Sequence, residues 1–116
     1  DQAKKIGNFF QDNKIPIDKV YSSEWCRCKE TASIAFNKYE TKNFLNSFFS
    51  SQFAKNKDSQ MKKIKKFIKN WDENKNLIFV THYVVISESL NYTPSSGEII
   101  VSNKDFKVID TIKTEY

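Results

Sequence analysis

The stretch LIFVT (residues 77–81), followed directly by His82, constrains the fold more than any other part of the sequence. It is a continuous run of apolar and β-branched residues that follows a polar connector at residues 72–76. A short run without polar alternation is typical of a strand that is buried on both faces of a parallel sheet. The sequence therefore predicts a buried parallel strand at residues 77–81 that ends at a histidine.

Helical and strand patterns alternate along the rest of the chain. Apolar spacing predicts helices at residues 2–13, 24–36, 58–73 and 83–91 and strands at residues 17–22, 37–41, 97–102 and 106–112. The aromatic segment 43–53 has no clean period and is interpreted as a loop with a helical turn. This order predicts a single α/β domain over residues 1–116, a three-layer sandwich with a mostly parallel sheet flanked by helices and a C-terminal edge hairpin.

Composition narrows the class of protein. The chain has a net charge of +5, but its 19 basic residues are interleaved with 14 acidic ones. This is the pattern of a solvated, Lys-rich surface, so no nucleic-acid partner is expected and a basic nucleic-acid-binding module is the weakest alternative. No stretch approaches the ~20 apolar residues of a membrane span, so no membrane partner is expected. Two Cys and one His are too few for a metal site. The compartment, cytoplasmic or periplasmic, depends on whether a signal peptide precedes residue 1.

Two residues stand out because each is the single one of its type. Arg27 is the one Arg among 19 basic residues, and His82 is the one His. In a chain this rich in Lys, a retained Arg suggests a need for its planar guanidinium group. The forked N–H groups of this guanidinium, called its fork below, can form two parallel hydrogen bonds to a phosphate or carboxylate. A surface salt bridge for Arg27 and a backbone hydrogen bond for His82 are the alternatives. Both residues follow predicted strands, and in such sheets ligands bind beyond the carboxyl ends of the strands.

The sequence VYSSEWCRCKETA (20–32) has a strand, two serines, three residues, Arg, three residues and then Thr-Ala. This order resembles the histidine phosphatase superfamily, which is also called phosphoglycerate-mutase-like. LIFVTHYVVI (77–86) resembles the same superfamily's late strand ending in Thr-His, GEIIV (97–101) looks like its next strand, and DQAKKIGNFF (1–10) looks like its Gln-Ala helix. The resemblance covers essentially the whole chain in the correct order.

That resemblance implies a function and a set of site residues. Members of the family hydrolyse phosphomonoesters or phosphohistidine through a phospho-His intermediate and need no cofactor. The partner would therefore be a phosphorylated small molecule or a phosphohistidine protein. By motif match, Arg27 and His82 are the expected phosphate-binding and catalytic residues. Ser22 and Ser23 are expected to cap the following helix and shape the phosphate pocket, with direct phosphate contact as the lesser alternative.

The chain departs from the family pattern in three places. No Arg-His-Gly motif occurs, and with His82 as the one His there is no candidate for the nucleophile. Neither cysteine has the spacing to Arg27 that cysteine phosphatases use. The acid that protonates the leaving group is Glu40, another residue, or absent. Tyr83 stands where many members have a small residue.

These departures predict that the chain begins part-way into the domain, because residues 1–3 enter the family's first helix at its middle without a preceding strand. The absent strand is normally central, so its neighbours would keep unpaired backbone groups and apolar surface. We therefore expect weak phosphate binding, no turnover, and self-association through the missing-strand gap. The alternative is a non-catalytic phosphate- or anion-binding or interaction domain.

Overall fold

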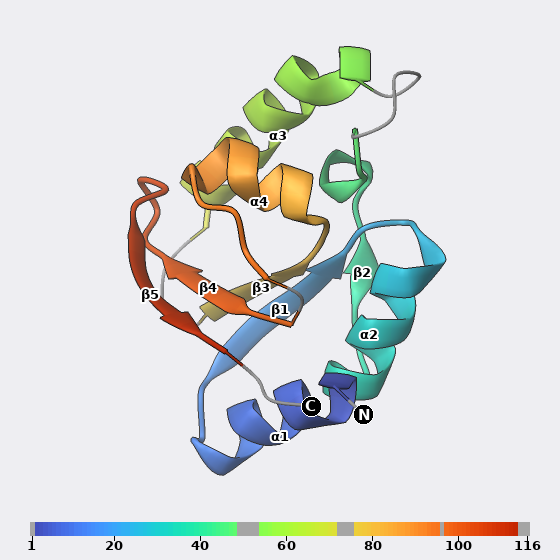
Figure 1. The fold of residues 1–116 in the computed structure, drawn as a ribbon, viewed down its shortest axis with the longest axis vertical. Helices are drawn as coiled ribbons and strands as arrows, with labels where there is room; N and C mark the ends of the chain where they lie inside the picture. Colours follow the sequence, from blue (N-terminus) through green and yellow to red (C-terminus); the bar gives the residue numbers. More distant parts are fainter. Residues whose placement is uncertain (1, 49–53, 72–75, 96, 114–116) are drawn as a thin grey trace.

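The computed structural model describes residues 2–48, 54–71, 76–95 and 97–113. Its elements are α1 (Gln2–Asp12), β1 (Ile17–Ser22), α2 (Cys26–Phe36), β2 (Glu40–Thr41), η1 (Asn43–Leu45), η2 (Ala54–Asn56), α3 (Lys57–Lys69), β3 (Asn76–Val80), α4 (Tyr83–Leu90), β4 (Ile99–Ser102) and β5 (Val108–Ile112). The predicted order of helices and strands is confirmed (Figure 1). Parts of the predicted loop at 43–53 and the end of the predicted helix at 58–73 lie outside the described residues.

The main sheet contains three parallel strands in the order β2-β1-β3. Tyr21 of β1 stands opposite Glu40 of β2 and Phe79 of β3, so β1 is central. The predicted parallel strand is therefore confirmed. Its predicted burial on both faces is wrong, because Leu77 to Val80 are each partly exposed. Within the described residues β3 pairs with β1 alone, which makes it an edge of this sheet.

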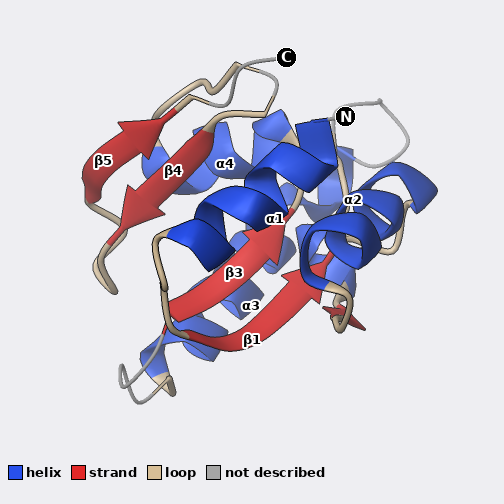
Figure 2. Cartoon of the chain, turned by 90° about the horizontal axis from the view of Figure 1, so that it is seen from below, coloured by secondary structure: helices blue, strands red, loops and turns tan. Residues whose placement is uncertain are grey.

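The predicted C-terminal hairpin is confirmed, but its predicted place at an edge of the main sheet is wrong, because β4 and β5 form an antiparallel sheet of their own (Figure 2). Its turn is organised by Asn103, whose Oδ1 accepts the backbone N–H groups of Asp105 and Lys107. The Lys104 Nζ donates to the carbonyl oxygen of Trp71, 2.7 Å away, just beyond the C-terminal end of α3. A cation beside helix carbonyls is favourable, so this contact anchors the hairpin to α3.

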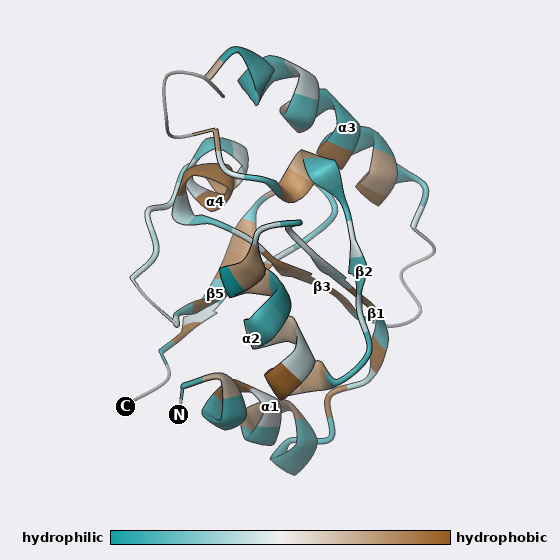
Figure 3. Cartoon of the chain, turned by 90° about the vertical axis from the view of Figure 1, so that its right-hand side faces the viewer, coloured by the Kyte–Doolittle hydropathy of each residue, from teal (hydrophilic) through white to brown (hydrophobic). Residues whose placement is uncertain are grey.

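Helices cover the main sheet on two sides, as the predicted three-layer sandwich requires. Helices α1 and α2 lie on one side and α3 and α4 on the other (Figures 1 and 3). The larger core lies on the α3 side and consists of Tyr21, Phe44, Leu45, Phe48, Ile64 and Val85. On the opposite side Ala32 of α2 is fully buried. Its small side chain lets the helix approach the sheet closely.

Helix α1 also packs closely on α2. A Cβ atom placed on Gly7 would lie 2.4 Å from the carbonyl oxygen of Ala35, which is well inside contact distance. Gly7 is therefore required by the helix contact. Among the described helices, none has the length and apolar character needed to cross a membrane.

Candidate functional site

The carboxyl ends of β1 and β3 lie side by side and bring two predicted site residues together. Ser22 stands opposite Val80, and the backbone N–H of Ser23 donates to the carbonyl oxygen of Val80 at 2.9 Å. The residues that follow each strand therefore meet. His82 Nε2 lies 2.9 Å from Ser23 Oγ.

The His82 ring is half-buried and has contacts on several sides. Besides Ser23, its Nε2 lies 3.7 Å from Cys28 Sγ. The Trp25 ring packs edge-on against it, with ring centroids 4.8 Å apart. Burial, and then the nearby charge of Arg27, hold the pKa of His82 below its ordinary value of 6.5. His82 is therefore neutral in the ligand-free protein at neutral pH.

Arg27 lies in the first turn of α2 and is exposed. Its guanidinium makes no ion pair or hydrogen bond with any part of the chain that the structure describes. The salt-bridge alternative thus finds no partner there. The same guanidinium is close enough to contribute to the lowered pKa of His82. Arg27 and His82 therefore belong to one electrostatic environment, and the fork of Arg27 is available to an anion.

Two helices begin at this place. Helix α2 follows β1, and α4 follows β3 with His82 as its N-cap residue. Neither N-cap side chain bonds the helix backbone. Helix N-termini carry partial positive charge and free N–H groups, so both helices favour an anion beyond the strand ends.

The expected helix cap by Ser22 and Ser23 is wrong, because the N-cap residue is Trp25. Ser23 lies two residues before the helix cap, and its Oγ accepts the N–H of Trp25 itself, at 3.1 Å. Ser22 Oγ donates to the carbonyl oxygen of Ser23 at 2.8 Å. Both serines are 0% exposed. Their hydroxyls organise the turn between β1 and α2 from inside the protein.

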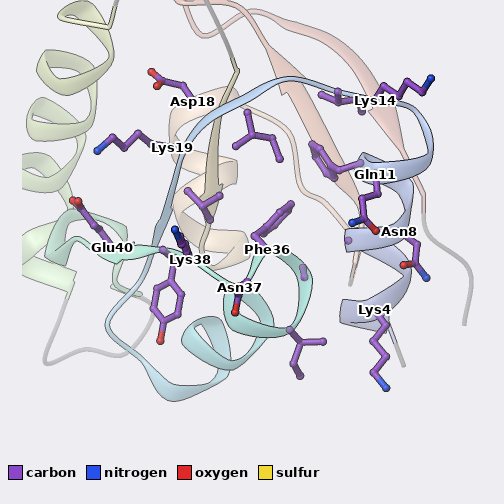
Figure 4. A pocket seen from close by; sticks show the side chains of 18 residues that line it. Lys4, Asn8, Gln11, Lys14, Asp18, Lys19, Phe36, Asn37, Lys38 and Glu40 are labelled. Carbon is purple, nitrogen blue, oxygen red and sulfur yellow. The ribbon is translucent and has the colours of Figure 1, made fainter.

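Glu40, one of the three alternatives for the proton donor, lies on β2 beside β1. Its side chain lines a cavity of about 1100 Å³ between α1, β1 and the end of α2, together with Lys19 and Lys38 (Figure 4). Neither Arg27 nor His82 lines this cavity. The structure therefore brings His82 and Ser23 together, places Arg27 within electrostatic range of His82, and places Glu40 on a separate cavity.

Asn46 belongs to the hydrogen-bond network around Ser23, although its sequence context does not predict this. Its Oδ1 accepts hydrogen bonds from Ser23 Oγ at 3.0 Å and from the backbone N–H of Glu24 at 2.8 Å. Its Nδ2 donates to Glu24 Oε1 at 2.9 Å. The backbone of Asn46 is held by Gln60, whose Nε2 donates to its carbonyl oxygen at 2.8 Å. Asn46 thus links α3 to the turn that carries Ser23.

A smaller cavity of about 240 Å³ lies beside this network. It is lined by Trp25, Asn43, Asn46, Ser47, Asn56, Ser59, Gln60 and Lys63. Trp25 also contacts the His82 ring, so the cavity adjoins the His82 site. Amides and hydroxyls dominate its wall, and Lys63 contributes the charge. This lining suits a small polar group.

The lowered pKa of His82 predicts a pH dependence of folding stability. The unfolded chain protonates this residue near its ordinary value of 6.5, whereas the folded chain protonates it at a lower pH. Between these two values the unfolded state binds more protons, so the free energy of unfolding falls as the pH is lowered through this window. Urea denaturation of wild type and His82→Gln between about pH 5 and about pH 7.5 checks this. The wild type is expected to lose more stability than the variant, and equal losses would contradict the prediction.

Comparison with known proteins supports the fold. No family model matches the chain, and no curated protein matches it in sequence. The chain is similar to a solved structure, that of the open reading frame Rv3214 from Mycobacterium tuberculosis, with a TM-score of 0.54 and 14% sequence identity. The match covers 79% of this chain and 64% of that one, so this chain spans less than two thirds of the structure it matches. At this identity the likeness shows that the two proteins share an α/β fold.

Proposed function

We propose that this chain is the phosphate-binding part of a histidine-phosphatase-like domain, with Arg27 and His82 as the residues that hold the phosphoryl group. The observation that carries the proposal is that Arg27, exposed and without a partner among the described residues, lies in the first helical turn after β1 and within electrostatic range of His82, which follows the parallel strand β3. The N-termini of α2 and α4 add partial positive charge at the same place. The motif resemblance around both residues supports the same assignment.

The chemistry of this arrangement is electrostatic. A phosphoryl group in transfer spreads negative charge over its oxygens, and fixed cationic donors stabilise this charge. Arg27 would bind two of these oxygens through its fork. Once protonated, His82 would add a hydrogen bond and a second positive charge. Because binding of an anion favours the charged imidazole, phosphate and a proton are expected to bind to this site together.

The nucleophile would come from outside residues 1–116. In the intact form, a histidine of an Arg-His-Gly segment would attack phosphorus. The P–O bond of a phosphomonoester, or the P–N bond of phosphohistidine, would break as the leaving group takes up a proton. Water would then hydrolyse the phospho-His, which releases inorganic phosphate and restores the histidine. Residues 1–116 alone would bind phosphate weakly and turn over nothing.

The partner of the site would be a phosphorylated small molecule or a phosphohistidine protein. The cavity of about 240 Å³ beside His82 favours the small molecule, because it offers amide and hydroxyl groups and one Lys to a compact polar substituent. The competing hypothesis is a non-catalytic anion-binding or interaction domain. It is favoured by the same phosphate-binding residues together with the absence of a second His from the sequence.

Hydrolysis of an aryl phosphate distinguishes the two hypotheses. The chain alone is expected to show no turnover above buffer. A form extended at its N-terminus by a segment that contains Arg-His-Gly is expected to hydrolyse the ester. It is also expected to accumulate a phosphorylated histidine that loses its phosphate in acid. An extended form that binds phosphate but neither turns over nor becomes phosphorylated would favour the anion-binding domain. Turnover by the chain alone would overturn the assignment of the nucleophile.

A further inference from the structure

The hydrogen bonds around Asn46 determine which of its amide atoms faces Ser23. The backbone N–H of Glu24 can only donate, and the Glu24 carboxylate can only accept. The atom that receives the Glu24 N–H must therefore be Oδ1, and the atom that contacts Glu24 Oε1 must be Nδ2. The same Oδ1 lies 3.0 Å from Ser23 Oγ. The partners on both sides thus set the orientation of the amide.

This orientation decides where the Ser23 hydroxyl hydrogen lies. Since Asn46 Oδ1 has no hydrogen, Ser23 Oγ must donate to it. Ser23 Oγ also receives the N–H of Trp25 at 3.1 Å, which uses one of its lone pairs. The remaining lone pair faces His82 Nε2 at 2.9 Å. His82 Nε2 must therefore carry a hydrogen and donate it to Ser23.

We propose that Asn46 is a positioning residue that acts through Ser23 to hold the neutral His82 in the tautomer with hydrogen on Nε2. Nδ1 then keeps the lone pair, and it makes no hydrogen bond with the described part of the chain. Proton uptake at this histidine therefore occurs on Nδ1. The tautomer follows from the hydrogen bonds alone, whereas its effect on phosphate rests on the proposed function.

The other groups near Nε2 are compatible with this assignment. Cys28 Sγ, at 3.7 Å, lies farther from Nε2 than Ser23 Oγ does. Cys28 also has a side-chain hydrogen bond with Ser23, but a thiol is a weak hydrogen-bonding group beside the ring N–H of His82. Burial raises the pKa of the Cys28 thiol, so it stays protonated and uncharged at neutral pH. The edge-on Trp25 ring restricts rotation of the imidazole. Ser23 is therefore the group that selects the tautomer.

Because His82 is the single histidine, nitrogen-15 NMR of the ring reports on it without overlap. In the wild type at neutral pH, Nε2 is expected to carry the proton and Nδ1 to be unprotonated. In Asn46→Leu, the Ser23 hydroxyl is free to turn and donate to Nε2, which stabilises the Nδ1–H form. The tautomer ratio is expected to change by about fivefold or more, the equivalent of one neutral hydrogen bond. A wild-type spectrum with hydrogen on Nδ1 would overturn the proposal without any variant.

Two further variants separate positioning from general damage to the fold. Asn46→Asp keeps an oxygen that accepts from Ser23, and the exposed Glu24 carboxylate, which loses its Nδ2 donor, can turn away from the new charge. The variant is therefore expected to retain the wild-type tautomer while its negative charge raises the pKa of His82. Asn43→Leu, which lines the same cavity but makes no side-chain hydrogen bond among the described residues, is expected to leave both properties unchanged. An unaltered tautomer ratio in a folded Asn46→Leu, or an equal change in Asn43→Leu, would refute the role of Asn46.

Inorganic phosphate then tests the functional consequence. Because Asn46→Leu lets Ser23 donate to Nε2 and so stabilises the neutral ring, protonating His82 costs more in this variant. It is therefore expected to bind phosphate about fivefold more weakly than the wild type. If the wild type has the expected tautomer and binds no phosphate, the proposed function fails and the positioning role of Asn46 stands. If phosphate binds but the tautomer is the other one, the positioning role fails alone.

Discussion

Arg27→Ala is expected to weaken the binding of inorganic phosphate by at least about tenfold. Hydrogen bonds to charged groups contribute about 1.5–3 kcal/mol each, and the planar fork of Arg27 can make two of them to one phosphate. The guanidinium is exposed and pairs with no described residue, so its removal is expected to change folding stability little. Equilibrium titration with phosphate, followed through the His82 ring signals, measures the effect.

Two further substitutions make this prediction specific. Arg27→Lys keeps the charge but loses the fork, so it is expected to bind phosphate with an affinity between those of the wild type and Arg27→Ala. Lys29→Ala removes a charge two residues along the same helix and is expected to weaken binding by less than about twofold. Equal losses for Arg27→Ala and Lys29→Ala would mean that phosphate responds to the overall positive charge and that the Arg27 fork has no special role.

Reversible self-association is the second large effect we expect. Within the described residues, β3 pairs with β1 alone and β4 pairs with β5 alone, so each of these strands keeps one edge without a strand partner. Unpaired N–H and C=O groups on such edges favour pairing with a strand of another chain. Sedimentation velocity at increasing protein concentration is expected to show a rising average mass. A monodisperse monomer of ordinary stability would contradict the prediction.

A charge placed on one of these edges tests whether strand pairing causes the association. Val101 lies on β4 and is 36% exposed, and Ile34 lies on α2 and is 40% exposed. Val101→Lys is expected to weaken association by about tenfold, because lysines on edge strands oppose pairing. Ile34→Lys adds the same charge at similar exposure away from the edges and is expected to leave association unchanged. If both variants reduce association equally, general charge repulsion is the cause.

Much of the fold is predictable because local patterns and tertiary packing agree. The alternating segment 17–22 and the strand β1, Ile17–Ser22, coincide. The apolar segment ending at His82 forms β3, and its neighbour α4 begins at Tyr83 as its spacing predicts. Parallel strands align their carboxyl ends, so the meeting of Ser23 and His82 also follows from sequence order.

The remaining features depend on contacts between segments that are distant in the sequence. The predicted burial of β3 on both faces is typical of a strand in the interior of a sheet, whereas β3 has one strand partner within the described residues and lies at an edge. The residues next to Asn46 in the sequence do not predict its contact with Ser23. Its position depends on the packing of the neighbouring Leu45, which is 1% exposed, and on the hydrogen bond from Gln60 to the carbonyl oxygen of Asn46. Glu40 matched the expected region of sequence, but a two-residue strand gives no periodicity that predicts which cavity its side chain lines.

The central claim is that Arg27 and His82 bind one phosphate group together. The most direct test is the pKa of His82, measured by NMR in the absence and presence of saturating phosphate. In the free protein the pKa is expected below its ordinary value of 6.5, because burial and Arg27 disfavour the charged ring. Bound phosphate is expected to raise it in the wild type, since a neighbouring anion favours the imidazolium, and to raise it far less in Arg27→Ala. A His82 pKa that saturating phosphate leaves unchanged in the wild type would contradict the claim.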